Sequence, residues 1–136
     1  MTTLVGTKGR HVLAEYWGCQ ADILGDKDLI KARMEDAARA AKATIVFSAF
    51  HKFTPTGVSG VVVVEESHLA IHTWPEEGYA SADFYTCGDC VPENALGLLQ
   101  EALRAERTHF LVIDRGMPGA TPSFKVRPNE QEALGT

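Results

Sequence analysis

Hydrophobic and polar positions alternate with a period of two through the middle of the chain. Residues 68–74 place Leu69, Ile71 and Thr73 on one side and the remaining four side chains on the other, which predicts a half-buried strand. The valines at 61–64 precede it and predict a strand within residues 58–65 that is buried on both faces. Glu66-Ser67 joins the two strands without glycine, proline or an Asn-Gly pair. We therefore expect chemistry at this junction.

The same patterns predict the remaining elements. Further strands are expected at 11–17, 44–53, 79–87 and 108–114. Apolar residues at helical spacing predict a helix that Asp26 or Asp28 caps and that runs to about Lys42. A second helix is expected from Pro92 to about Arg107. Residues 116–136 are rich in Pro, Gly and polar groups and are expected to form a loose tail.

The order of these elements is βαββ followed by ββαβ. It predicts an α+β fold, a two-layer sandwich in which two helices cover one face of a mostly antiparallel sheet. A length of 136 residues favours a single domain. The second face of the sheet also needs a cover, and self-association would provide one.

Composition excludes several classes of function. A net charge of −5 argues against nucleic-acid binding, which would require a basic face. No apolar run approaches the length of a membrane span, and the N-terminus lacks the apolar core of a signal peptide. Three cysteines are an odd number, so we do not expect a disulfide framework. We expect a cytoplasmic location instead.

Several short motifs together resemble the prokaryotic S-adenosylmethionine decarboxylases. The resemblance covers about residues 9–114. The matching stretches, in order, are Phe50-His51-Lys52-Phe53, Gly57-Val58-Ser59-Gly60, Glu66-Ser67-His68-Leu69, Ile71-His72-Thr73-Trp74-Pro75-Glu76, Gly78-Tyr79-Ala80 and Thr86-Cys87-Gly88. The resemblance implies a dimeric proenzyme of polyamine synthesis that cuts itself into residues 1–66 and 67–136 and carries a covalent pyruvoyl group.

A serine at the junction suits this self-cleavage. The Ser67 hydroxyl can attack the Glu66 carbonyl and convert the amide to an ester. β-Elimination then breaks the chain and leaves dehydroalanine, which takes up water and loses ammonia to become a pyruvoyl group at the new end. These steps need a base, groups that stabilise the oxyanion and a distorted peptide. The resemblance assigns the base to His72 and an assisting role to Ser59.

The resemblance also assigns the residues of the decarboxylation. The pyruvoyl carbonyl would form a Schiff base with the substrate amine and accept electrons as carbon dioxide leaves. Cys87 is the implied proton donor, and a thiol is largely protonated at neutral pH. Phe53 and Glu76 are the implied substrate-binding residues, since an aromatic ring can stack on adenine and a carboxylate can accept both ribose hydroxyl protons.

Two features leave alternatives open. Glu77 stands where relatives of this family have an aromatic residue, and a more acidic pocket would suit arginine or ornithine. Cys87 and Cys90 form a Cys-x-x-Cys pair, as in thiol–disulfide modules. The chain has no second pair, so we expect no zinc site. His11, His51 and His68 receive no role, and structural histidines are the expectation.

The spacing of Ser67 and His72 indicates whether one chain can build the site alone. Ser67 and His72 differ by an odd number of positions, so a regular strand sends their side chains to opposite faces. At a rise of about 3.3 Å per residue they also lie roughly 16 Å apart. Either the strand breaks after Ser67 or the base comes from a neighbouring chain. We expect the neighbour, with Ser67 and Cys87 from one protomer and Ser59, His72, Phe53 and Glu76 from its partner.

Overall fold

The computed structural model describes residues 7–87, 89–119 and 123–128. Its elements follow the expected order, with one additional strand, β7, and two additional short helices, α1 and η2. Their bounds are β1 Gly9–Trp17, α1 Ala21–Leu24, α2 Lys27–Ala40, β2 Ile45–Lys52, β3 Val58–Val64, β4 Ser67–Trp74, the 3-10 helix η2 Pro75–Glu77, β5 Tyr79–Thr86, α3 Pro92–Ala102, β6 Arg107–Arg115 and β7 Ser123–Pro128.

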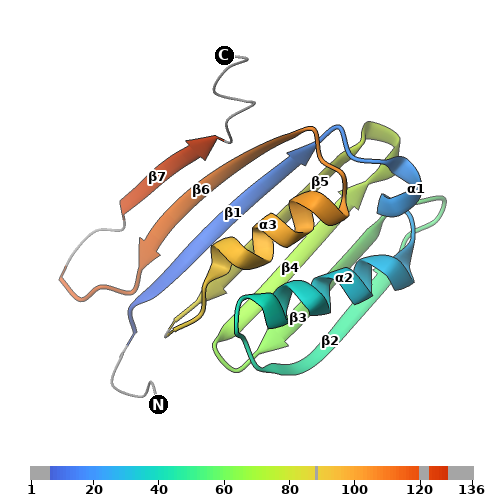
Figure 1. The fold of residues 1–136 in the computed structure, drawn as a ribbon. Helices are drawn as coiled ribbons and strands as arrows, with labels where there is room; N and C mark the ends of the chain where they lie inside the picture. The colour runs from blue at the N-terminus through green and yellow to red at the C-terminus, as the bar shows by residue number, and fades with distance from the viewer. Residues whose placement is uncertain (1–6, 88, 120–122, 129–136) are drawn as a thin grey trace.

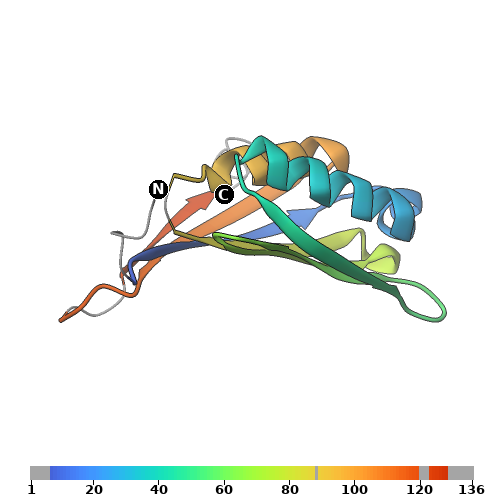
Figure 2. The same ribbon diagram turned by 90° about the horizontal axis from the view of Figure 1, so that it is seen from below.

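The strands form one antiparallel sheet in the order β2-β3-β4-β5-β1-β6-β7. Helices α2 and α3 run across the same face of this sheet (Figure 1), and the view along the sheet shows them as a separate layer (Figure 2). The predicted two-layer α+β sandwich with a mostly antiparallel sheet is therefore confirmed.

The core lies between the helices and the sheet because each element presents one apolar side to the other. Leu69, Ile71 and Phe84 are fully buried on the helix side of β4 and β5, while His72 and Trp74 of β4 are exposed. From the helices, Ile30, Met34, Leu96 and Leu99 are fully buried against them. The alternation that predicted the strands thus also decides which face is covered.

Hydrogen bonds fix the start of helix α2 and the position of helix α3 on the sheet. The Asp26 side chain accepts a bond of 3.1 Å from the backbone N–H of Leu29, so Asp26 rather than Asp28 is the cap of α2. On the other helix, the buried Tyr16 hydroxyl of β1 donates to the Leu96 carbonyl over 2.7 Å. This bond ties α3 to the strand beneath it.

Two boundaries differ from the sequence-based expectation. Helix α3 ends at Ala102 rather than near Arg107, because the chain turns at Arg104, whose φ is +56°. The expected loose tail from Gly116 is wrong for Ser123–Pro128, which form β7 and pair with β6 from His109↔Pro128 to Asp114↔Ser123. The rest of that tail beyond residue 128 lies outside the described residues.

The face of the sheet away from the helices is open in the described part of the chain (Figure 2). It carries His72 and Trp74 of β4 and exposed Phe47 of β2. None of the described helices combines the length and the apolar character that crossing a membrane would require.

Candidate active site

The expected cleavage junction lies at a tight hairpin between β3 and β4. Ser67 is the first residue of β4, and its φ of +152° is unusual for a residue with a side chain. Such a backbone conformation costs on the order of 1–3 kcal/mol and persists only where its surroundings enforce it. Here the Glu66 carboxylate accepts a bond of 3.1 Å from the Thr44 N–H, and the Glu65 N–H donates to the Thr44 carbonyl over 2.9 Å. The hairpin is thus held from the start of β2.

Cys87 lies against this junction although it is distant in sequence. It follows β5, the strand next to β4, in which Thr86 faces Ser67. The backbone N–H of Cys87 donates to the Glu66 carbonyl over 3.3 Å, and its Sγ lies 3.6 Å from the same oxygen. The structure therefore brings Cys87, Glu66 and Ser67 together, and the carbonyl of the expected scissile bond is polarised by two donors.

A cavity of about 360 Å³ adjoins this group, lined by Lys8, Gly9, Arg10, Thr86, Cys87, Asp89, Cys90 and Asp114. Burial raises the pKa of the Cys90 thiol, and the negative charges of Glu66 and Asp89 add to the effect. Reactive redox cysteines have lowered thiol pKa values instead. The Cys90 thiol therefore lacks the lowered pKa of a reactive redox cysteine.

A second group of expected site residues lies toward the other end of β4. Ser59 of β3 and His72 of β4 face each other in register, and Ser59 Oγ lies 2.7 Å from His72 Nδ1. A hydroxyl bonded to an imidazole is the arrangement from which a proton can be withdrawn or delivered. The imidazole is exposed, so it is accessible to a group outside this chain.

Phe53 and Glu76 adjoin that hydroxyl–imidazole pair. They line a cavity of about 310 Å³ whose wall is completed by Thr56, Gly57, Ser59, His72, Thr73 and Trp74. Phe53 is 47% exposed, and its ring meets the His51 ring edge-on at 4.7 Å between centroids. Glu77, the next residue in η2, is not among these lining residues.

The two groups do not meet within the chain. Strand β4 runs from Ser67 to Trp74 without a bulge in its pairing with β3 or β5, so no break follows Ser67. The side chain of His72 projects from the open face, while residues at odd positions of β4 project toward the helices. In this chain His72 therefore cannot reach the Glu66–Ser67 bond.

Sequence reasoning missed some neighbours of these groups. Trp74 lines the Phe53 cavity, and its ring lies 5.3 Å from that of Tyr79, which lies 4.2 Å from Trp17. Burial, with a hydrogen bond from its hydroxyl to Glu15, raises the pKa of Tyr79 to about 12. The sequence did carry a signal for Trp74: the alternation that puts it on the same side as His72 predicts that both side chains lie at the same cavity.

Comparison with known proteins decides the family. The sequence model of the S-adenosylmethionine decarboxylases matches residues 10–116. The chain belongs to the S-adenosylmethionine decarboxylase family. Its relatives include S-adenosylmethionine decarboxylase proenzyme 2 of Halalkalibacterium halodurans, 52% identical over 82% of this chain and 88% of that protein. The S-adenosylmethionine decarboxylase proenzyme of Thermotoga petrophila is 51% identical over 79% of this chain and 84% of that protein.

One solved structure agrees with this family, and a more distant one shares the fold. The crystal structure of the adenosylmethionine decarboxylase from Aquifex aeolicus superposes with a TM-score of 0.76 and 36% identity, over 85% of this chain and 97% of that one. The Trypanosoma brucei AdoMetDC-delta26 monomer shares the fold, with a TM-score of 0.58 and 14% identity over 76% of this chain and 45% of that one. The α+β sandwich described above is therefore the fold of this family.

Proposed function

We propose that this chain is a self-cleaving S-adenosylmethionine decarboxylase whose pyruvoyl group forms from Ser67. The observation that carries the proposal is the 3.6 Å contact between Cys87 Sγ and the Glu66 carbonyl, at a serine with a positive φ. In a family of decarboxylase proenzymes, this contact puts a proton donor beside the bond whose cleavage creates the cofactor. Its product would be the aminopropyl donor of polyamine synthesis.

Cleavage requires a nucleophile and an activated carbonyl, and the hairpin supplies both. The Ser67 hydroxyl belongs to the residue directly after the Glu66 carbonyl, which accepts the Cys87 N–H. The strained φ at Ser67 raises the energy of the intact peptide relative to the ester. These features fit a pyruvoyl precursor at position 67.

The pyruvoyl group would supply a carbonyl that takes up the substrate amine and accepts the electrons released as carbon dioxide departs. The residues around it have simpler tasks. Cys87 holds a proton on Sγ, at the end of β5 where residue 67 lies alongside Thr86. That proton is the one that we assign to the substrate carbon after decarboxylation.

The separation of the two groups supports a composite site in a homodimer. His72 is five positions along an unbroken strand from Ser67, about 16 Å by the rise of a strand, and proton transfer needs roughly 3 Å. The open sheet face that bears the Ser59–His72 pair is available to a second copy. We assign Ser67 and Cys87 to one protomer of each site, and Ser59, His72, Phe53 and Glu76 to its partner.

The cavity lined by Phe53 suits S-adenosylmethionine. The Phe53 ring and the Trp74 ring offer faces to adenine, and a sulfonium over either would gain about 0.5–2 kcal/mol. The Glu76 carboxylate can accept the ribose hydroxyls. Glu77 does not line this cavity, so the additional negative charge that would favour arginine or ornithine is absent from its described wall, where Glu76 is the one acidic residue.

The test is release of carbon dioxide from carboxyl-labelled substrates. S-adenosylmethionine should be decarboxylated faster than arginine or ornithine at equal concentration, and Ser67→Ala should release none. Phe53→Ala should raise KM by about tenfold, the loss of one stacking contact of roughly 1–2 kcal/mol. Faster release from arginine or ornithine would refute the assigned substrate. Activity in Ser67→Ala would refute the assigned cofactor.

A further inference from the structure

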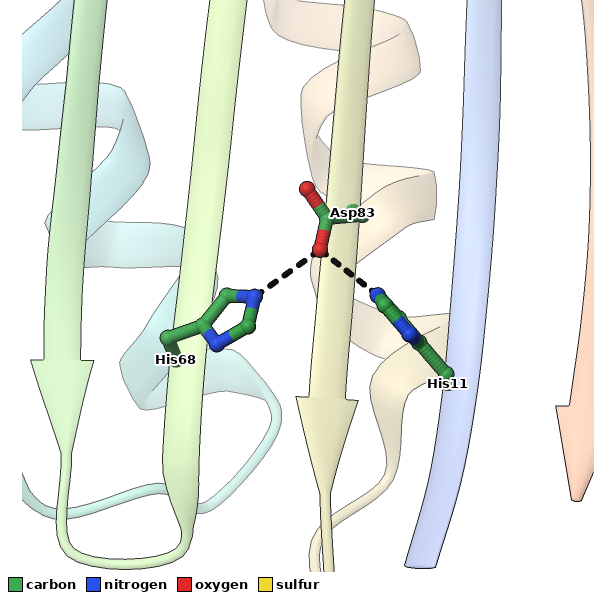
Figure 3. A group of neighbouring side chains, drawn as sticks. All are labelled: His11, His68 and Asp83. Carbon is green, nitrogen blue, oxygen red and sulfur yellow. Dashed lines mark hydrogen bonds and ion pairs between the residues drawn. The ribbon is translucent and has the colours of Figure 1, made fainter. Parts of the chain in front are cut away.

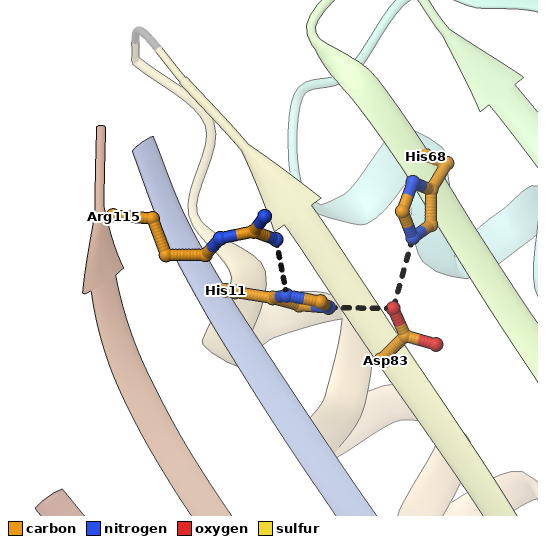
Figure 4. A network of polar contacts seen from close by, with 4 residues as sticks. All are labelled: His11, His68, Asp83 and Arg115. Carbon is orange, nitrogen blue, oxygen red and sulfur yellow. Dashed lines mark hydrogen bonds and ion pairs between the residues drawn. The ribbon is translucent and has the colours of Figure 1, made fainter. Parts of the chain in front are cut away.

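Four polar side chains form a continuous line across the open face of the sheet, which we call the cross-sheet network: His68 of β4, Asp83 of β5, His11 of β1 and Arg115 of β6. One oxygen of Asp83, Oδ2, lies 2.9 Å from His68 Nε2 and 2.7 Å from His11 Nε2 (Figure 3). The Nη1 of Arg115 lies 3.0 Å from Nδ1 of His11 (Figure 4). The line ties four neighbouring strands together.

The direction of each bond follows from the donors present. A guanidinium has no acceptor, so Arg115 donates to His11 Nδ1, and the proton of this imidazole must then lie on Nε2. An ionised carboxylate only accepts, so both imidazoles donate to Asp83. The side chains of His11, Asp83 and His68 are 18%, 26% and 34% exposed, which strengthens these charge-assisted bonds relative to bonds in water.

Two histidines and one aspartate are also a possible metal-ligand set, with donor atoms within 4.8 Å of one another. A metal on His11 Nε2 would move the imidazole proton to Nδ1, and a ligating histidine gives that proton to an acceptor. Here Nδ1 faces the guanidinium of Arg115, whose carbon also lies 4.5 Å from the centre of the Tyr85 ring. A donor in that place favours the hydrogen-bonded network over a metal site.

The end of the network on β4 is significant because His68 follows Ser67 directly. Cleavage before Ser67 removes the covalent link to β3 and turns the start of β4 into a chain terminus, and free termini fray. His68 is opposite Tyr85 and Asp83 is opposite Ala70, so the His68–Asp83 bond runs diagonally between β4 and β5. It holds the new terminus to the strand that leads into Cys87.

We propose that the cross-sheet network is a positioning device that keeps residue 67 aligned with Cys87 once the chain has been cut. The inference rests on the proposed function, because it assumes cleavage at Glu66–Ser67 and a proton on Cys87. In the uncut chain the covalent hairpin already holds Ser67, so the network is needed only afterwards. His68 and Asp83 are therefore positioning residues, with a larger effect on turnover than on cleavage.

The test compares Asp83→Asn in the cut protein and in the uncut Ser67→Ala background, by hydrogen exchange resolved to peptides. In the cut protein the amides of residues 68–71 should exchange about tenfold faster than in the parent, as expected for one lost charge-assisted bond. In the Ser67→Ala background the same substitution should change them little. Turnover should fall roughly 10- to 100-fold, with a smaller change in KM. Glu93→Gln is the matched control. It removes the ion pair between Arg10 of β1 and Glu93 of α3, and neither residue belongs to the cross-sheet network.

Several results would overturn the inference. Equal acceleration in cut and uncut protein would make the network a general support of the sheet. If Asp83→Asn changed neither hydrogen exchange nor turnover, the cross-sheet network would have no positioning role. Stoichiometric zinc binding that Asp83→Asn abolishes would make the cluster a metal site. Failure of the proposed function is distinguishable, because wild-type protein would then be a single uncut chain by mass before any exchange is measured.

Discussion

The divided site makes a quantitative prediction about mixed dimers. His72 lies five positions from Ser67 on the unbroken strand β4, about 16 Å away and on the opposite face, whereas proton transfer needs roughly 3 Å. If the partner supplies His72, a dimer of a Ser67→Ala chain and a His72→Ala chain holds one site with both residues and one site with neither. The His72→Ala chain should be cut and the Ser67→Ala chain should not.

The expected turnover follows from counting sites. One complete site in two gives about half of the wild-type activity per mixed dimer. Different affinity tags on the two chains allow the mixed dimer to be isolated, gel mobility reports the cut chain, and labelled carbon dioxide reports turnover. The Ser67→Ala and His72→Ala homodimers are the controls and should both be inactive. Verified mixed dimers in which neither chain is cut would show that the site is built within one chain.

Three further predictions concern the residues around the site. Cys87→Ala should still be cut but should lose about 100-fold or more in turnover, the scale of a missing general acid, while Cys90→Ala should retain turnover; equal losses would indicate a paired thiol function. Gly60→Ala should lower Tm by roughly 5–10 °C in calorimetry, because a Cβ there would overlap the Phe50 ring and overpacking costs about 1–3 kcal/mol; an unchanged Tm would mean that the ring moves freely. Iodoacetamide at about pH 8 should leave Cys19 unmodified until the protein is unfolded, because burial raises the pKa of its thiol to about 11; rapid labelling of folded protein would contradict this burial.

The sequence predicted the strands well where one face is buried. Leu69 and Ile71 are buried and His72 is exposed, as the alternation required. It overestimated the second helix because Leu103 continues the apolar spacing and is fully buried, although the chain has already left α3 at Ala102. Periodicity records which side chains pack and does not record where the backbone turns.

Features that depend on strand order could not be predicted. Asp83 meets His68 and His11 only because β5 lies between β4 and β1, and β1 comes from the start of the chain. Pairing of β7 with β6 likewise depends on a partner strand rather than on its own short sequence. The resemblance to a family could identify Cys87 but not its contact with the Glu66 carbonyl, which the β4–β5 register creates.

Intact mass spectrometry of the freshly purified, denatured protein tests the central claim most directly. We predict two chains, residues 1–66 and 67–136, the second lighter than its encoded sequence by the difference between serine and a pyruvoyl group and unreactive in Edman sequencing. Ser67→Ala should give one chain of full length. A wild-type protein that remains whole while decarboxylating S-adenosylmethionine would contradict the pyruvoyl mechanism.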